Sequence, residues 1–335
     1  MVEAIIVQCG ANFMNADQQN RLANVLSEIT QLRPALNEWG DKLRQKIEER
    51  EKNEPDESLR TSGTYWALVA YADALTRLRL IVEQNFQFVE TLGLLAVTRY
   101  IFELTVWLRA LAQDSRYGLS YYFQIIEKQI RYYEDFVKRM EHEIARLKRL
   151  GEEERVEIEA MTKAILSKHD KDSTEALLSL SKKIHSETDR KARRNFCMYA
   201  DQARTNGHSF QAFLIERQIL PKLHAKLEEC TKERAKRLAS VKARPPAGTK
   251  WDKQEQSWQW KQQAASVGMS DQYEFIYSFT SRLLHATPVS LTTNQKLLEP
   301  EEMHRFLEYI YVSILDIVDL AKQMLGEPTA DATVR

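Results

Sequence analysis

The sequence predicts an all-α protein, a helical bundle from which a long helical hairpin projects. Glycine and proline number only 10 and 8 among 335 residues, so few positions interrupt a helical backbone. Leu, Ala, Glu, Gln, Lys and Arg dominate the composition, and these side chains lose little freedom in a helix. Amphipathic stretches between the few breaks are typical of helices that pack by one face.

Three helical segments are expected in the first part of the chain, over residues 16–53, 58–88 and 91–112. Pro34 interrupts the first, because proline lacks an N–H and clashes inside a helix. The third segment is the most apolar, yet it carries arginines and a glutamate. It is therefore predicted to be a buried core helix rather than a membrane span. Turn signals around Gly118 follow it.

A long amphipathic helix is expected next, over residues 121–150. Its aromatic first half is predicted to pack on the core, and its charged second half to project into solvent. Gly151 and the acidic run 152–159 either break or bend it. Further helices are expected over 174–186, 189–205 and 210–240.

The loop 243–249, with Pro245 and Pro246, is the clearest internal boundary. The helices expected after it cover residues 253–266, 271–285 and 301–325. Pro300 is typical of the start of the last helix, where following acidic residues meet the positive end of the helix dipole.

Two regions far apart in the chain are predicted to form one core bundle, residues 16–120 with residues 250–326. Residues 121–240 would form the extension, and residues 327–335 a disordered tail. This division would let polar motifs from both ends of the chain meet in space.

Composition excludes several classes of protein. There are 48 basic and 48 acidic residues, so the chain as a whole has no electrostatic footprint for nucleic acid or for an anionic membrane. Its three cysteines form no C-x-x-C pair, which indicates a reducing, cytoplasmic location. The first ten residues lack the basic region of a signal peptide.

No metal or cofactor is expected. The seven histidines show no metal-ligand spacing. Phosphate-binding glycine loops and the G-x-S-x-G motif of hydrolases are also absent from the sequence.

Two helices carry unusual polar groups. Arg99 and Glu103 lie four residues apart in the apolar segment, so they share one face of its helix. A buried charge costs several kcal/mol unless it is paired. Arg99 has five donors, and some should therefore reach beyond Glu103.

The second helix carries a polar stripe of Tyr273, Tyr277, Ser281 and His285 at every fourth position. Such a stripe indicates either an internal hydrogen-bond network or the wall of a cleft. In the second case His285, Arg99 and Glu103 are the catalytic candidates. His285 would be the general acid or base, and Arg99 would neutralise an anionic group such as phosphate. Tyr273, Tyr277 and Ser281 would contact the ligand.

The R-x-x-x-E helix and the later W…Y-x-x-x-Y-x-x-x-S-x-x-x-H pattern, which begins at Trp258, resemble a bacterial family known only as a domain of unknown function. The resemblance covers roughly residues 58–325. It implies an all-helical protein of similar length, with no established activity.

A more distant analogy is to nucleotide-binding helical bundles that cut RNA. Those enzymes carry R-x(4–6)-H on one helix, whereas Arg282 here precedes His285 by only three positions and Phe279 lies six before it. The arginine of such a site would have to be Arg99.

The segment 222–250 holds nine basic residues against three acidic ones, and Trp251, Trp258 and Trp260 follow it. Basic side chains with nearby aromatics can bind RNA or a nucleotide. The alternative is a solvated helix face. A second basic cluster, around Lys182, Lys183 and residues 191–194, would extend the patch if the helices lie side by side.

Two functions are open at this point. The first is a non-enzymatic interaction or regulatory module of a bacterial stress or antiphage system, with an unknown protein partner or self-association and no membrane contact. The second is a helical effector that acts on RNA or a nucleotide through His285 and Arg99.

Overall fold

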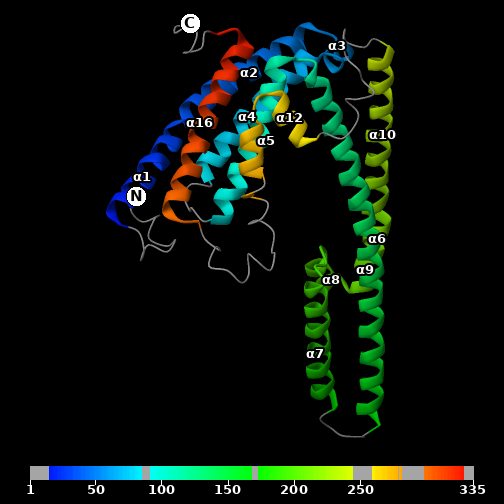
Figure 1. The fold of residues 1–335 in the computed structure, drawn as a ribbon. Coiled ribbons are helices and arrows are strands. Elements are labelled where there is room, and N and C mark those ends of the chain that lie inside the picture. Colours follow the sequence, from blue (N-terminus) through cyan, green and yellow to red (C-terminus); the bar gives the residue numbers. More distant parts are fainter. Residues whose placement is uncertain are drawn as a thin grey trace. The chain divides into compact units, whose positions relative to one another are not determined.

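The computed structural model describes residues 15–84, 91–167, 173–243, 259–277, 279–280 and 298–327. Within these ranges every regular element is helical and no strand occurs (Figure 1). The predicted all-α class is therefore confirmed.

The chain divides into two compact units. Unit 1 comprises residues 1–123 and 239–335, and unit 2 comprises residues 124–238. The boundaries fall inside two helices, α6 (Tyr117–Leu166) and α10 (Leu220–Ala243). The projecting hairpin stays a prediction, and the expected disordered tail lies outside the described residues except for Glu327.

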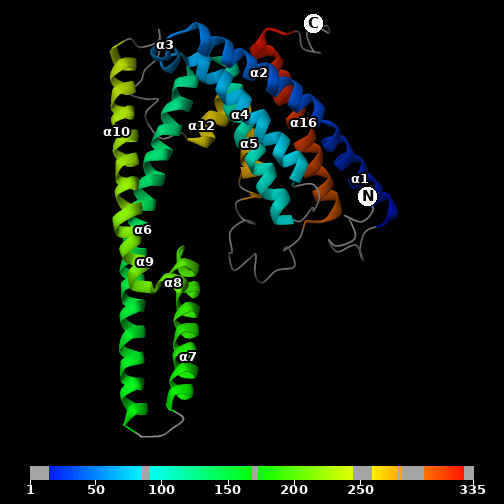
Figure 2. The same ribbon diagram turned by 180° about the vertical axis from the view of Figure 1, so that it is seen from behind.

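Unit 1 is a bundle of long helices that share one core (Figure 2). Its long helices are α1 (Ala16–Gln31), α2 (Arg33–Asn53), α4 (Gly63–Gln84), α5 (Thr91–Gln113) and α16 (Pro300–Leu325). Shorter elements are α3 (Asp56–Arg60), α12 (Trp260–Ser266), α13 (Ser270–Gln272) and the π-helical turn η4 (Tyr273–Tyr277). The interruption expected near Pro34 lies at Leu32, so that proline occupies the first turn of α2.

α5 is the central helix of unit 1. Leu95, Ile101 and Leu108 are fully buried in the main cluster, with α4 and α16 among the helices that cover them. Phe102 and Val106 face a second cluster formed with α12 and η4. Among the described helices only α5 is long and apolar enough to cross a membrane, but more than half of that window is buried inside the protein.

The ends of α16 carry the signals that the sequence predicts. Pro300 begins the helix, and Glu299 and Glu302 form a reciprocal capping box that satisfies free N–H groups of the first turn. Gly326 ends the helix in the left-handed conformation, with φ of 79°.

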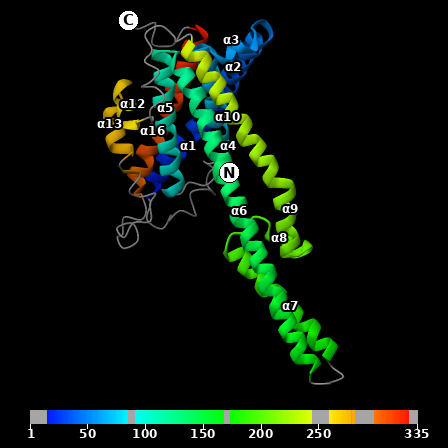
Figure 3. The ribbon, with the colours of Figure 1, turned by 90° about the vertical axis from the view of Figure 1, so that its right-hand side faces the viewer.

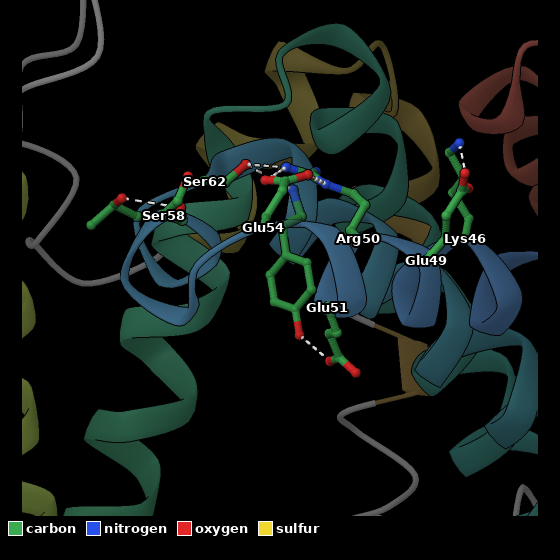
Figure 4. Close-up of polar contacts among 9 residues, drawn as sticks. Lys46, Glu49, Arg50, Glu51, Glu54, Ser58 and Ser62 are labelled. Carbon is green, nitrogen blue, oxygen red and sulfur yellow. Dashed lines mark hydrogen bonds and ion pairs between the residues drawn. The ribbon is translucent and has the colours of Figure 1, made fainter.

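A polar junction closes the turn between α2 and α4 (Figure 4). The guanidinium of Arg50 donates to the Glu54 carboxylate at 2.6 and 2.8 Å and to Ser62 Oγ at 3.3 Å. This hydrogen bonding lowers the pKa of Glu54. The Tyr65 hydroxyl donates to Glu51 at 2.6 Å, and burial raises the pKa of Tyr65 to about 12. These contacts hold the first turn of α4 against the end of α2.

The turn predicted around Gly118 lies at residues 115–116, and Gly118 itself lies in the first turn of α6. A Cβ at Gly118 would overlap the carbonyl oxygen of Gly63 and lie 2.8 Å from the Ala67 nitrogen. A Cβ at Gly63 would in turn lie 2.6 Å from the Ser115 oxygen. Glycine is therefore required here by the close approach of two backbones.

Unit 2 is built along α6 (Figure 3). Its other elements are α7 (Ser173–Arg194), α8 (Ala200–Asn206), α9 (His208–Leu214), the π-helical turn η3 (Ile215–Ile219) and most of α10. Val137, Met140 and Leu147 of α6 form its core with residues of α8, α9 and η3.

α6 continues through Gly151, which was expected to break or bend it. A Cβ at this position would overlap Ser209 Oγ, so Gly151 admits the start of α9 against α6. The π-helical turn η3 comes just before Pro221, whose missing N–H removes one bond of the helical ladder.

The Gly63–Gly118 approach gives a first prediction. Gly118→Ala should lower the free energy of unfolding by about 3 kcal/mol or more, because backbone atoms must move to admit the methyl group. Gly40→Ala in α2 is the matched control, since a Cβ there meets its neighbours at 3.6 Å or more. The control should be neutral or stabilising by about 0.5–1 kcal/mol. Urea denaturation measures both, and equal effects would contradict the backbone contact.

Candidate functional site

The predicted Arg99–Glu103 pair is formed. Arg99 Nε donates to Glu103 Oε1 at 3.1 Å along α5. The two side chains are 25% and 27% exposed, so the pair lies at the edge of the core and is not sealed inside it.

Arg99 also reaches the second predicted helix. Its guanidinium carbon lies 4.2 Å from the ring centroid of Tyr277, a distance typical of a cation–π contact. The Tyr277 ring stacks on Tyr273 with centroids 4.9 Å apart and planes 17° apart. Tyr273 then packs near Phe102 on α5. The four residues Glu103, Arg99, Tyr277 and Tyr273 form a polar–aromatic ladder between α5 and η4.

The other two candidates, Ser281 and His285, lie outside the described residues. Their convergence with Arg99 stays a prediction. The described part of the ladder consists of paired groups: a carboxylate on one side of Arg99 and an aromatic face on another.

An open cavity of about 460 Å³ lies elsewhere in unit 1. It is lined by residues of α5 and α16 together with Val267, and it includes none of the predicted site residues. Arg109 donates to Asp316 at 2.9 Å in its wall, and Lys322 neutralises Asp319 at 2.7 Å. The charged side chains of the cavity wall are thus largely paired, so the cavity offers little net electrostatic attraction to a charged ligand.

The described part of the basic segment 222–250 is extensively paired. Arg234 contacts Glu127 at 2.6 Å, and the buried Arg237 contacts Glu233 at 2.6 Å. Lys226 and Lys232 contact glutamates of α10 at 2.7 and 2.5 Å. These pairs favour a helix surface over an RNA site for residues 222–243. Residues 244–258, including Trp251 and Trp258, lie outside the described residues.

A partly buried carboxylate–imidazole cluster in unit 2 was not predicted, in which Glu154 and His208 are buried and His185 is 55% exposed. Glu154 of α6 accepts hydrogen bonds from His185 Nδ1 of α7 and, at 3.1 Å, from His208 Nδ1 of α9. The His208 side chain is only 3% exposed, and its Nε2 lies 3.9 Å from Asp189 Oδ1. The cluster ties three helices together. Within the described ranges no group of His, Cys, Asp and Glu has the geometry of a metal site.

The turn that follows α7 was also missed. α7 ends with Cys197 N–H donating to Ala192 O at 3.0 Å and Phe196 N–H donating to Arg193 O at 2.9 Å. This pair of bonds is the Schellman motif, which places Phe196 at the position that requires a left-handed backbone. The φ of Phe196 is indeed 53°.

The Schellman motif also occurs in unit 1, where glycine, the residue that this motif favours, occupies the left-handed position. Gly268 after α12 and Gly326 after α16 occupy the equivalent position, with φ of 73° and 79°. Among the described residues Phe196 is the only non-glycine with positive φ. A side chain there costs about 1–2 kcal/mol relative to glycine.

Three side chains of α6 hold this turn, which comprises residues 195–198 and is called the Phe196 turn below. Arg146 donates to Asn195 O at 2.7 Å, and Arg139 donates to Phe196 O at 3.4 Å. The buried Glu143 accepts from the Tyr199 N–H at 3.1 Å. The spacing of 139, 143 and 146 places all three on one face of α6.

The contacts to the backbone leave two apolar side chains in solvent. Phe196 is 76% exposed and Met198 is 45% exposed. The Arg139 guanidinium lies 5.2 Å from the Phe196 ring centroid. Cys197 points inward, where burial raises the pKa of its thiol.

No protein family model, curated protein or solved structure matches the chain. The resemblance to an uncharacterised bacterial family therefore stays a prediction.

The ladder gives a second prediction. A double-mutant cycle of Arg99→Ala with Tyr277→Leu should show a coupling of about 0.5–1 kcal/mol in the free energy of unfolding, since the cation–π contact is partly exposed. Tyr277→Phe keeps the ring and is the control, and its cycle with Arg99→Ala should show a coupling near zero, because this substitution leaves the cation–π contact in place. A coupling near zero with Tyr277→Leu would show that the contact contributes nothing to stability.

The Phe196 turn gives a third prediction. Phe196→Ala keeps the strained φ and loses the ring, whereas Phe196→Gly removes the strain. The glycine variant should therefore be more stable than the alanine variant by about 1 kcal/mol. Thermal or urea unfolding measures the difference. An alanine variant at least as stable as the glycine variant would contradict the strained conformation.

Proposed function

We propose that the protein is a helical binding module and that the Phe196 turn is its contact point. One observation carries the proposal: a large apolar side chain occupies an exposed position where the backbone favours glycine. The only ring contact that Phe196 makes among the described residues is the one with Arg139, so its side chain buries little surface in exchange for the strained backbone. Strain of this kind is concentrated at functional sites.

The way in which the turn is held supports the same proposal. Arg139, Glu143 and Arg146 contact its backbone and so fix the direction in which Phe196 points. A rigid, exposed aromatic loses little conformational entropy when a partner covers it. Such side chains supply much of the binding energy at protein surfaces.

The sequence also left open an effector that acts on RNA or a nucleotide through His285 and Arg99. The geometry of the described residues gives this function no support. Arg99 is paired with Glu103 and stacked on Tyr277. Neither Arg99 nor Glu103 lines the described cavity.

A photo-crosslinking experiment tests the proposal as the fourth prediction. Benzoylphenylalanine in place of Met198, in cells that express the full chain, should give a discrete covalent adduct on irradiation. The same probe in place of Val156, a half-exposed residue of α6, should not. Adding Phe196→Gly, which preserves the turn, should abolish the adduct. The proposal fails if position 198 gives no adduct, or none beyond that at position 156.

A further inference from the structure

The charges around the Phe196 turn indicate what kind of partner it binds. Arg139, Arg146 and Arg194 have no carboxylate partner among the described residues. Arg193 pairs with Asp201 at 3.1 Å and Lys191 with Glu153 at 3.3 Å, both as exposed ion pairs. The exposed Phe196 ring thus lies beside the guanidinium of Arg139, which has no carboxylate partner among the described residues, and Arg194 lies two positions before it in the chain.

From this arrangement we infer that the Phe196 turn binds single-stranded nucleic acid. The Phe196 ring would stack on a base, while Arg139 and Arg194 contact the flanking phosphates. This inference rests on the proposed binding function and names the chemistry of its ligand. Aromatic platforms flanked by cations are the common mode of sequence-tolerant binding to single strands.

The geometry favours this ligand over two others. Arg139 lies over the Phe196 ring, yet the residue as a whole is 76% exposed, so the side chain is open to a planar partner. An anionic membrane would need a larger apolar face than Phe196 and Met198 present. A protein pocket would have to supply carboxylates for Arg139 and Arg194 as well as cover the ring, whereas a nucleic acid carries a phosphate beside every base.

The basic residues of the Phe196 turn also differ from those of the segment 222–243. Four cations of that segment have carboxylate partners, and Arg237 is buried. Phosphate binding releases counterions only where cations are available to replace them. The nucleic-acid site is therefore placed at the end of α7 and not along α10.

The fifth prediction uses the full chain and a fluorescein-labelled oligouridylate of about 20 nucleotides, with binding followed by anisotropy at several salt concentrations. Wild type should bind at low salt and weaken steeply as salt rises. Phe196→Leu, which keeps apolar bulk, should bind about tenfold more weakly, and Phe196→Trp should bind at least as well as wild type. The double variant R139Q/R194Q should lower the salt slope by about 1–1.5.

Two control variants in unit 1 separate the turn from general surface effects. Arg305→Gln removes an exposed arginine of α16, and Phe275→Leu removes an exposed aromatic ring of η4. Both should bind the oligonucleotide as wild type does. Equal loss in these controls would overturn the inference.

Other outcomes also overturn it. The inference is wrong if the wild-type protein does not bind the oligonucleotide at low salt. It is also wrong if Phe196→Leu and Phe196→Trp bind it equally well. A membrane contact would be identified instead if the protein binds no RNA but co-sediments with phosphatidylserine vesicles, and if the Phe196→Leu variant co-sediments as well. In the crosslinking experiment, an adduct at position 198 whose electrophoretic mobility is unchanged by nuclease keeps the binding module and removes nucleic acid as its ligand. Absence of any adduct removes the module itself.

Discussion

Burial of α5 is the constraint on which unit 1 depends. Its side chains are apolar around most of the helix, and each large one contributes about 1.5–3 kcal/mol when buried. α4, α16, α12 and η4 pack against it for that reason. The polar residues Arg99, Glu103 and Arg109 lie where this coverage ends, each partly exposed and each paired. The ladder to Tyr277 is thus a consequence of how α5 is covered.

In unit 2 the organising element is α6, whose faces have different partners. Glu154 faces the imidazoles of α7 and α9, Gly151 admits Ser209, and Arg139, Glu143 and Arg146 meet the Phe196 turn. Because these positions are spread over sixteen residues of one rigid helix, the partners are held in fixed register. The Phe196 turn owes its geometry to this register and not to its own sequence.

The sequence predicted those features whose chemistry is local. Pro34 and Pro300 begin helices through their own geometry, and the i,i+4 spacing of Arg99 and Glu103 was enough to predict their pairing. The turn near Gly118 was predicted, but the packing role of Gly118 and Gly151 was not, because the need for glycine comes from Gly63 and Ser209 on other helices. The Glu154 cluster and the Phe196 turn join residues 31–57 positions apart, and no spacing rule predicts such contacts.

The Schellman motif with phenylalanine has a consequence for the order of folding. A glycine at the end of a helix is a local stop signal that acts before tertiary structure forms. α7 lacks that signal, so its end is defined only once Arg139, Glu143 and Arg146 bind the turn. We therefore expect the last turn of α7, with its exposed ring and arginines, to form after α6 and α7 have docked. α12 and α16, by contrast, are each followed by a glycine with positive φ, Gly268 and Gly326, which ends the helix locally.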